Sequence, residues 1–163
     1  MLKAAIDDNI DHLQPWVPWA DDEPSTLEAI QERVAKHAAN FFGDSEWLYA
    51  LHTREHGVLV GGAGLYARVG PGAVEIGYWV HRAWTRRGFA LEAAGALTRE
   101  ALRRADIARV EMHIDQLNAA SAVIPARLGY RHARTDQQAP RRAGEAAREI
   151  MVWEITPGGA ATG

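Results

Sequence analysis

The sequence predicts a mixed α/β (α+β) domain built on one central sheet whose strands are mostly antiparallel and flanked by helices. Three observations lead to this class. Segments with apolar residues at helical spacing alternate with short strand-like runs, glycine-containing turns separate the first three of those runs, and 163 residues are enough for one domain with its own core. We therefore expect a single domain over residues 1–156, followed by a disordered tail over residues 157–163.

The N-terminal part is expected to contain two helices and then three strands. One amphipathic helix is predicted by apolar residues at helical spacing: Leu2, Ile6, Ile10 and Leu13. After the breaking segment PWVPWADDEP, Ser25 and Glu28 match a capping box at the start of a second helix. The runs EWLYALH, GVLVGGAGLY and AVEIGYWV then predict strands, the first two joined by the turn TREHG.

The C-terminal part is expected to alternate helices and strands. A long helix is predicted from Gly88 to about residue 105, and a shorter one from Asn118 to Leu128, where Gly129 is a typical helix stop. The runs ARVEMHID, GYRHA and REIMVWEI predict strands, of which the second is short.

Composition narrows the class of function. The net charge of −3 and the pI of about 6.2 argue against a nucleic-acid-binding protein, which normally has a basic surface. No apolar run approaches the ~18 residues of a membrane span and no signal pattern opens the chain, so we expect a cytoplasmic protein without a membrane partner. Because the chain has no cysteine, its chemistry cannot pass through an acyl-cysteine or use thiolate metal ligands.

Two short motifs are better explained by local structure than by chemistry. His52, Glu55 and His56 match the H-x-x-E-H pattern of a class of zinc proteases, but their flanks predict strand, turn and strand, where zinc binding requires a helix. The segment GAGLYA matches a dinucleotide fingerprint, yet RVGPG follows it and cannot form the helix on which a pyrophosphate would lie. We interpret GAGLYA as a closely packed strand and expect no metal site.

The segment TRRGFALEAAGAL differs, because its glycine lies between a predicted strand and a long helix. A helix N-terminus offers unpaired N–H groups and a partial positive charge to an anion. Gly88 would let the backbone approach closely, while Arg86 and Arg87 would add charge and forked donors for phosphate. A solvated basic turn is the alternative. Further along, Asn118 and Ser121 lie three residues apart on one face of a helix.

At these two segments the chain resembles a known family. EIGYWVHRAWTRRGFALEAA followed by NAASAVIPARLGYR resembles the acyl-CoA-binding core of the GCN5-related N-acetyltransferases (GNAT), and is most similar to the RimJ/RimL-type branch, which acetylates protein α-amino groups and small amines. The resemblance extends from Leu2 to Ile155. The family normally has a strand before its first helix, so we expect either that an edge strand is missing or that the sequence begins inside a longer natural protein. An uncovered neighbouring strand would favour a homodimer.

The resemblance implies that acetyl-CoA is the co-substrate and that no metal takes part. Its pyrophosphate would lie on a loop that starts at Thr85, where the family usually has glutamine or arginine, and continues through Arg86, Arg87, Gly88, Phe89 and Ala90. Its pantetheine chain would pair with the backbone of the preceding strand and be held by the next helix, through Tyr78, Trp79, Val80, His81 at the strand exit, and Asn118.

Acetyl transfer to an amine needs one group that takes the amine's proton and another that serves the departing thiolate. Many family members use a tyrosine for the thiolate, seven residues after the asparagine, where this chain has Pro125. The resemblance therefore implies Ser121, although a helix serine bonded to its own backbone is the alternative. As base we favour Glu75, which shares a strand face with Trp79. The other candidates alternate on the neighbouring strand: Glu111, His113 and Asp115.

The segment LQPWVPWADDEP lies where the family builds the wall of its acceptor site. We expect the acceptor to contact Trp16, Trp19, Glu111 and His113. The adjacent carboxylates would attract a cation: Asp21, Asp22 and Glu23.

Together these features predict an N-acetyltransferase that moves an acetyl group from acetyl-CoA to a primary amine by direct attack in a ternary complex. The amine would belong to a protein N-terminus or a small molecule. One alternative is a non-catalytic acyl-CoA-binding regulatory module. A toxin that acetylates charged tRNA is a weaker alternative, because it would need the basic surface that a net charge of −3 does not supply.

Overall fold

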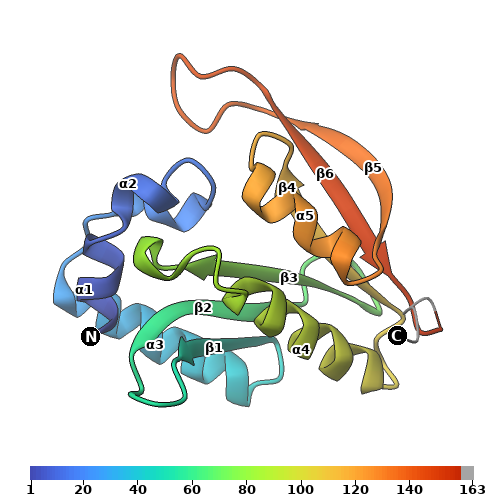
Figure 1. The fold of residues 1–163 in the computed structure, drawn as a ribbon, viewed down its shortest axis with the longest axis horizontal. Helices are drawn as coiled ribbons and strands as arrows, with labels where there is room; N and C mark the ends of the chain where they lie inside the picture. The colour runs from blue at the N-terminus through green and yellow to red at the C-terminus, as the bar shows by residue number, and fades with distance from the viewer. Residues whose placement is uncertain (159–163) are drawn as a thin grey trace.

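Six strands form one open sheet in the computed structural model, which describes residues 1–158 (Figure 1). The strands are β1 (Glu46–His52), β2 (Leu59–Tyr66), β3 (Ala73–Val80), β4 (Arg109–Asp115), β5 (Arg131–Gln138) and β6 (Arg148–Ile155). Their spatial order is β1-β2-β3-β4-β6-β5. Only the β3–β4 pair is parallel in this sheet, so the predicted fold class is confirmed. The predicted tail lies outside the described residues from residue 159 onward.

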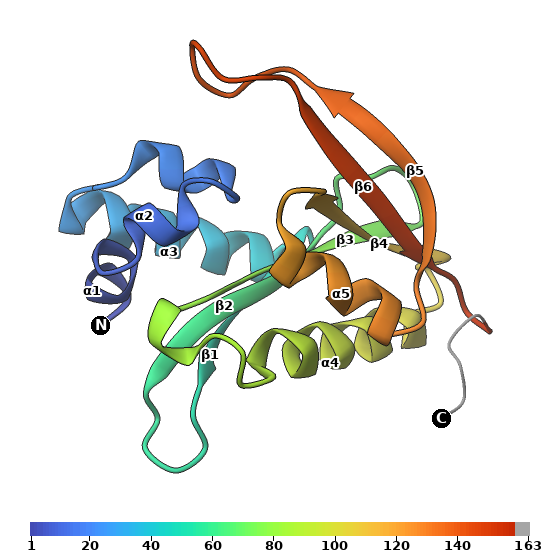
Figure 2. The ribbon, with the colours of Figure 1, turned by 45° about the horizontal axis from the view of Figure 1, so that its top comes forward.

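Within residues 1–158, five α-helices and two short 3-10 helices accompany the sheet. The α-helices are α1 (Leu2–Asp7), α2 (Ile10–Leu13), α3 (Leu27–Phe42), α4 (Phe89–Arg103) and α5 (Ala119–Arg127), and the 3-10 helices are η1 (Pro18–Asp22) and η2 (Arg82–Trp84). Helix α4 packs on β2, β3 and β4, and α5 packs on β4 and α4 (Figure 2). Helix α3 packs against β1, and α1 contacts β2. No described helix is long and apolar enough to cross a membrane.

The main core lies between the sheet and the two helices α4 and α5. Val74 and Ile76 of β3 meet Val110 and Met112 of β4 there, because alternate residues of a strand point to one face. Side chains of α4 and α5 close the cluster, among them Ala94, Leu97 and Ile124. The intervening residues of β3 and β4 therefore face the other side of the sheet, where Glu75 and Glu111 lie.

The glycine-rich strand β2 shows why GAGLYA is a strand. Its neighbour Trp79 lies so close that an added Cβ on Gly62 would come within 2.7 Å of the indole Nε1. A Cβ on Gly64 would meet Leu48 of β1 at 3.0 Å. The segment is therefore a closely packed strand, as predicted, and its glycines make room for side chains on both neighbours. The segment HTREH forms the end of β1 and the turn into β2, which also confirms the prediction.

The predicted N-terminal helix is wrong in one respect, because it is broken into α1 and α2 around Asn9. This asparagine is fully buried. Its Nδ2 donates to the Ala5 carbonyl oxygen at 2.7 Å, and its Oδ1 accepts from the Arg82 backbone N–H at 2.6 Å. Asn9 thus ties the N-terminal helices to the turn after β3. The partner of its Oδ1 is distant in sequence, so helical spacing could not reveal the break.

Replacing Asn9 by alanine should lower the free energy of unfolding by about 2–4 kcal/mol, because it leaves two buried backbone groups unpaired and creates a small cavity. Urea unfolding followed by circular dichroism measures this change. Asp7→Asn is the control, since it removes only an exposed ion pair with Lys3 and should change stability by less than about 0.5 kcal/mol. Equal effects of the two changes would show that Asn9 does not have this role.

Two further element boundaries differ from the prediction. Helix α3 is capped by Thr26, whose Oγ1 accepts from the Ala29 N–H at 3.2 Å, so the predicted cap at Ser25 is wrong by one residue. Ser25 instead donates to the Asp22 carbonyl oxygen and accepts from Arg33. Strand β5 extends over Arg131–Gln138 and is much longer than the predicted GYRHA strand. Its second half is polar and exposed, and pairing with β6 rather than apolar alternation keeps it extended.

Candidate active site

The strands β3 and β4 separate in the middle of the sheet. They pair only from Ala73 with Arg109 to Glu75 with Glu111. Beyond that point the residues Ile76–Val80 pair with β2 on one side and with no described strand on the other. The separation leaves backbone groups of β3 available to a ligand chain that enters between the two strands. These are the residues that the sequence predicts for the pantetheine chain, Tyr78, Trp79 and Val80.

The exit of β3 leads into a loop that can receive an anion. Gly88 is the N-cap of α4 and has φ +86°, in the left-handed region that favours glycine. No atom lies within 4 Å of the position where a Cβ on Gly88 would stand, so the backbone is open to a ligand there. The first N–H groups of α4 have no partner within the helix. Loop and helix thus form the geometry predicted for a phosphate site.

The arginines of this loop are arranged around one tryptophan. The Arg87 guanidinium lies 4.6 Å from the centre of the Trp84 ring, and Phe89 packs edge-on against the same ring at 5.8 Å. Arg86 has a positive φ of 60°. This stacking holds the loop in shape and orients Arg87, which remains exposed. Trp84 was not predicted as a site residue. Its closeness in sequence to the two arginines could have identified it as a residue of the site.

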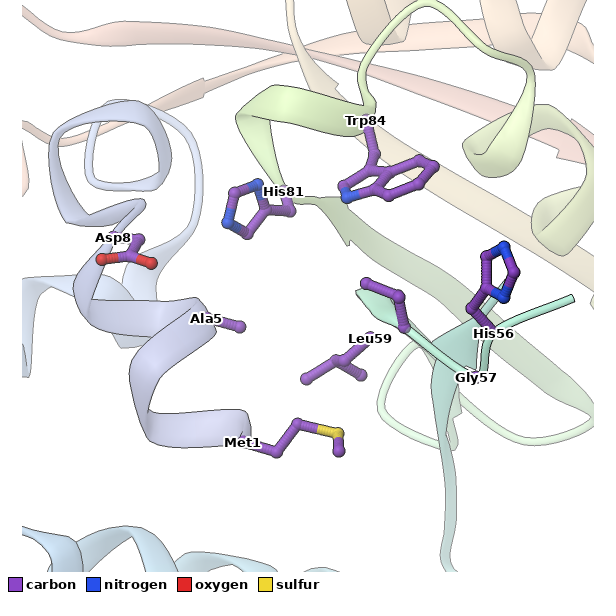
Figure 3. Close-up of a pocket in the computed structure, with 9 residues that line it drawn as sticks. Met1, Ala5, Asp8, His56, Gly57, Leu59, His81 and Trp84 are labelled. Carbon is purple, nitrogen blue, oxygen red and sulfur yellow. The ribbon is translucent and has the colours of Figure 1, made fainter. Parts of the chain in front are cut away.

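His81 lies at the exit of β3 but is occupied by structural contacts. Its backbone N–H donates to the Val60 carbonyl oxygen at 2.8 Å, and its Nδ1 accepts from the Ala83 N–H at 3.2 Å. Its side chain lines a shallow pocket of about 350 Å³ together with residues of α1 and of the β1–β2 turn (Figure 3). None of the loop residues Arg86–Ala90 lines that pocket. The cofactor contact of His81 stays a prediction.

Two hydroxyl groups meet on the helical side of the separated strands. Asn118 caps α5, and its Oδ1 accepts from the Ser121 backbone N–H at 3.2 Å, which places Ser121 in the first turn. The Tyr78 hydroxyl is buried and makes no hydrogen bond of normal geometry with a described residue. Burial raises the pKa of Tyr78 to about 12, and the nearby Ser121 hydroxyl limits the rise. Sequence reasoning assigned Tyr78 only a backbone contact and missed this hydroxyl.

The opposite side of the sheet carries a group of charges at the point where the strands separate. Glu75 accepts two hydrogen bonds from Arg68, at 2.7 and 2.8 Å. On β4, Glu111 is almost fully buried and bonds His113 Nε2 and Arg109 Nε, both at 2.6 Å. Burial by itself would raise the pKa of Glu111, but the hydrogen bonds to His113 and Arg109 lower it overall. The carboxylate therefore stays ionised at neutral pH.

The imidazole of His113 lies between the two predicted carboxylates. Its Nε2 is committed to Glu111, whereas its Nδ1 is 4.0 Å from the nearer oxygen of Glu75. The side chain is 22% exposed, so the imidazole can be reached by an approaching molecule. The candidates that the sequence left open are thus brought together here, while Asp115 lies further along β4 and is bound by Arg148 at 2.6 Å. Among the described residues, no group of three or more acidic or histidine side chains is arranged to hold a metal ion.

The two predicted tryptophans of the acceptor wall have different surroundings. Trp19 of η1 packs edge-on against Trp79, with ring centres 6.0 Å apart, and so joins the face that carries Glu75. Trp16 lines a pocket of about 500 Å³ between the α2–η1 segment, the end of β4 and the loop that connects β5 and β6. That loop reaches over toward α2 (Figure 1), and Arg141 within it donates to the Gln14 carbonyl oxygen.

The expectation that acidic residues attract a cation is wrong for two of the three side chains. Asp21 is bound by Arg142 at 2.6 Å and lies 3.7 Å from Arg141. Glu23 is buried, bound by Arg33 at 2.8 Å, and accepts the Ser25 N–H. Their charge is therefore neutralised by arginines from α3 and from the β5–β6 loop. These arginines are distant in sequence, and local composition gave no sign of the pairing.

Comparison with known proteins agrees with this geometry. A model of the acetyltransferase (GNAT) domain family matches residues 4–131. Among solved structures, RimL, a ribosomal L7/L12 α-N-protein acetyltransferase in complex with coenzyme A, has a TM-score of 0.85 at 20% identity, covering 95% of this chain and 86% of that chain. None of the curated proteins compared matches the chain.

Two further solved structures share the fold. The microcin C7 self-immunity acetyltransferase MccE, in complex with acetyl-CoA and AMP, has a TM-score of 0.84 at 13% identity, covering 95% of this chain and 84% of that one. RimJ of Mycobacterium smegmatis, in complex with CoA-disulfide, has a TM-score of 0.80 at 18% identity, covering 94% and 75%. The predicted family is thus confirmed. The chain belongs to the GNAT family of acetyltransferases, whose model matches most of its length.

Proposed function

We propose that the acceptor is a primary amine, of a protein N-terminus or of a small molecule, which attacks acetyl-CoA directly in a ternary complex. One observation carries this proposal: β3 and β4 separate beside the open Gly88 loop, with titratable side chains on one face and two hydroxyls on the other. The chain has no cysteine that could hold the acetyl group in between. RimL, a ribosomal-protein α-N-acetyltransferase, shares the fold and supports a protein N-terminus as acceptor. MccE, a microcin C7 self-immunity acetyltransferase, also shares the fold and supports a small-molecule acceptor.

The residues present fit acetyl-CoA. The open backbone at Gly88, the unpaired N–H groups of α4 and the charges of Arg86 and Arg87 suit a pyrophosphate. The unpaired edge of β3, at Tyr78–Val80, suits the amide groups of pantetheine. Asn118 uses its Oδ1 as the cap of α5, so only its amide nitrogen is available to a ligand. Acetyl-CoA supplies an acetyl group that is activated as a thioester.

We assign the role of base to His113 rather than to Glu75. The carboxylate of Glu75 already accepts a hydrogen bond from Arg68 at each of its two oxygens, so it is less available to the incoming amine. Glu111 holds Nε2 of His113 and leaves Nδ1 to take the proton of the incoming amine, directly or through one water. Glu75, 4.0 Å from Nδ1, then stabilises the positive charge on the imidazole. The three side chains thus act as one unit, in the manner of a base with an orienting carboxylate.

We propose that the hydroxyls of Ser121 and Tyr78 together provide a hydrogen bond to the departing thiolate. Both hydroxyls lie on the face of the sheet opposite to His113, so the amine and the thiolate are served from opposite sides. The Tyr78 hydroxyl has no other partner among the described residues, and its raised pKa keeps it protonated at neutral pH. It can therefore donate a hydrogen bond either to the sulfur or to Ser121. The position that holds a tyrosine in many family members is Pro125, which has no proton to give.

Tyr78→Phe and Ser121→Ala are each expected to lower kcat about 10-fold with little change in the KM for acetyl-CoA. The effect is modest because a thiolate is a good leaving group and departs without complete protonation. If the hydroxyls act as a pair, the double variant should be no slower than the slower single variant. Tyr130→Phe is the control, because Tyr130 is a buried tyrosine whose hydroxyl is already bonded to Thr98 at 2.7 Å. A kcat loss in Tyr130→Phe as large as that in Tyr78→Phe would contradict the assignment.

The proposed function is tested by thiol release from acetyl-CoA with a panel of amines: short peptides, polyamines, amino acids and aminoglycosides. The chain has no thiol of its own, so slow turnover is visible over a clean background. Release with one class of amine identifies the acceptor. A rise in melting temperature with acetyl-CoA but no release with any amine would indicate the non-catalytic binding module instead. The cytoplasmic location and a homodimer paired along the edge strand β1 stay predictions.

A further inference from the structure

The pocket beside Trp16 is lined by Arg141, whose guanidinium uses only part of its hydrogen-bonding capacity. Arg141 lies in the loop between β5 and β6, and its side chain is 16% exposed. Its Nη2 donates to the Gln14 carbonyl oxygen, while Nε and Nη1 are buried and make no hydrogen bond with any residue from 1 to 158. Unpaired donors of a buried cation are costly, because water no longer solvates them. A ligand that accepts from them would remove this cost.

The acidic side chains around Arg141 leave its Nε and Nη1 without a hydrogen bond. The nearest, Asp21, is 3.7 Å from Nε and is shared with Arg142, which holds it at 2.6 Å. Asp115 is bound by Arg148, Glu149 accepts from Gln137, and Glu145 is exposed on the rim. Burial, followed by the nearby charge of Arg148, lowers the pKa of Arg141, and the adjacent carboxylates only offset this in part. None of these carboxylates therefore makes a hydrogen bond with Nε or Nη1 of Arg141.

The pocket adjoins the proposed transfer centre. Asp115 at its edge follows His113 by two residues on the same face of β4, which is a separation of about 6.6 Å along a strand. A cavity of about 500 Å³ accommodates a short peptide segment or a small metabolite. A molecule whose amine is at His113 would thus place an atom about 7 Å from that amine in the pocket that Arg141 also lines.

We propose that this pocket binds a carboxylate of the acceptor and that Arg141 recognises it through Nε and Nη1. The proposal rests on the proposed function, and it names the acceptor class: amines that carry a carboxylate several bonds away. A forked guanidinium matches a carboxylate with two parallel hydrogen bonds. A doubly charged phosphate fits less well, because Glu145 and Asp115 line the same pocket. The carboxylate belongs either to an acidic second residue of a peptide or to a linear amino acid.

The test compares acceptors that differ only in this charge. One pair is a short C-terminally amidated peptide with aspartate or asparagine as its second residue, and the other is 6-aminohexanoate and its amide. The native chain should use the carboxylate member of at least one pair about 10-fold better, measured as kcat/KM. The pair that shows the preference identifies the source as peptide or small molecule. Equal values within both pairs would overturn the proposal while leaving the acetyltransferase function intact.

Variants of Arg141 distinguish recognition of the carboxylate from structural support of the β5–β6 loop. In Arg141→Gln the carboxylate-to-amide ratio should fall to about 1, and Arg141→Lys, which keeps the charge without the fork, should retain part of it. Arg142→Gln is the matched control: this neighbour pairs with Asp21 outside the pocket lining and should keep the full ratio. If Arg141→Gln slows both members of a pair equally, Arg141 only anchors the loop and the proposal is wrong.

The same ratio can be read without turnover. Calorimetry of each acceptor pair with the CoA-bound protein should give tighter binding of the carboxylate member, by about 10-fold in Kd. If no amine supports thiol release but this preference is present, the transfer proposal fails and the carboxylate site stands. Equal Kd values within both pairs would exclude the site whether or not the enzyme turns over.

Discussion

Replacing His113 by glutamine is expected to lower kcat by about 100-fold or more at neutral pH, because the amine then loses the group that takes its proton. Glutamine fills similar space and can still donate to Glu111, so the fold should be retained. The deficit should shrink as the pH rises toward the pKa of the acceptor amine, about 8 for an α-amine, since a deprotonated amine needs less help from a base. Steady-state thiol release between about pH 6 and pH 9 measures both effects.

His132→Gln is the matched control for this change. His132 lies on β5, is exposed, and is 3.1 Å from Thr135, outside the proposed site. Its replacement should leave kcat within about two-fold of the native value. A deficit for His113→Gln that stays constant across the pH range would mean that His113 positions the acceptor without taking its proton. Glu75 would then return as the favoured base.

Replacing Gly88 by valine is expected to raise the KM for acetyl-CoA about 100-fold, since a side chain there would stand where phosphate has to approach the backbone. The same change forces a β-branched residue to φ +86° and should cost about 1–2 kcal/mol of stability. Apart from its two neighbours in the chain, no residue has an atom within 4 Å of the new Cβ, so no further clash within the chain is expected. Enzyme kinetics with varied acetyl-CoA, together with thermal unfolding, separate the two effects.

Gly70→Val provides the comparison for the backbone strain alone. Gly70 lies in the turn between β2 and β3, has φ +105°, and also has no atom within 4 Å of its Cβ position. It should lose similar stability while keeping the native KM. If Gly88→Val loses stability but binds acetyl-CoA normally, the loop does not hold the pyrophosphate. The basic segment would then be the solvated turn that the sequence left as an alternative.

Elements whose signals are local were predicted well. β3 and β6 have the predicted bounds, because apolar alternation between clear turns specifies a half-buried strand. The start of α4 follows from Gly88, the only type of residue that takes this left-handed conformation at little cost. The errors at Asn9 and Ser25 arose where a hydrogen bond decided between neighbouring positions. At Asn9 the partner is Arg82, on another part of the chain.

The sequence indicated which residues of the candidate site lie close together, but not which of their charges are paired with other side chains. Glu75, Glu111 and His113 were expected on one side of neighbouring strands, and the structure brings them together at the separation of β3 and β4. The sequence favoured Glu75 because its partner Arg68 could not be identified from alternation. Tyr78 was assigned only a backbone contact with the cofactor, since the surroundings of its hydroxyl depend on a helix that follows much later in the chain.

By itself, the sequence determined the family, the loop before α4, and the residues that face each other across β3 and β4. These follow from backbone preferences and strand alternation, which are interactions between near neighbours. Only the tertiary structure decided which charges are neutralised: Asp21 and Glu23 by distant arginines, Glu75 by Arg68. It also decided that two N–H donors of Arg141, Nε and Nη1, have no hydrogen-bond partner among the described residues. Whether an ionised group is free to act depends on desolvation and on partners within a few ångströms, and folding brings these from any part of the chain.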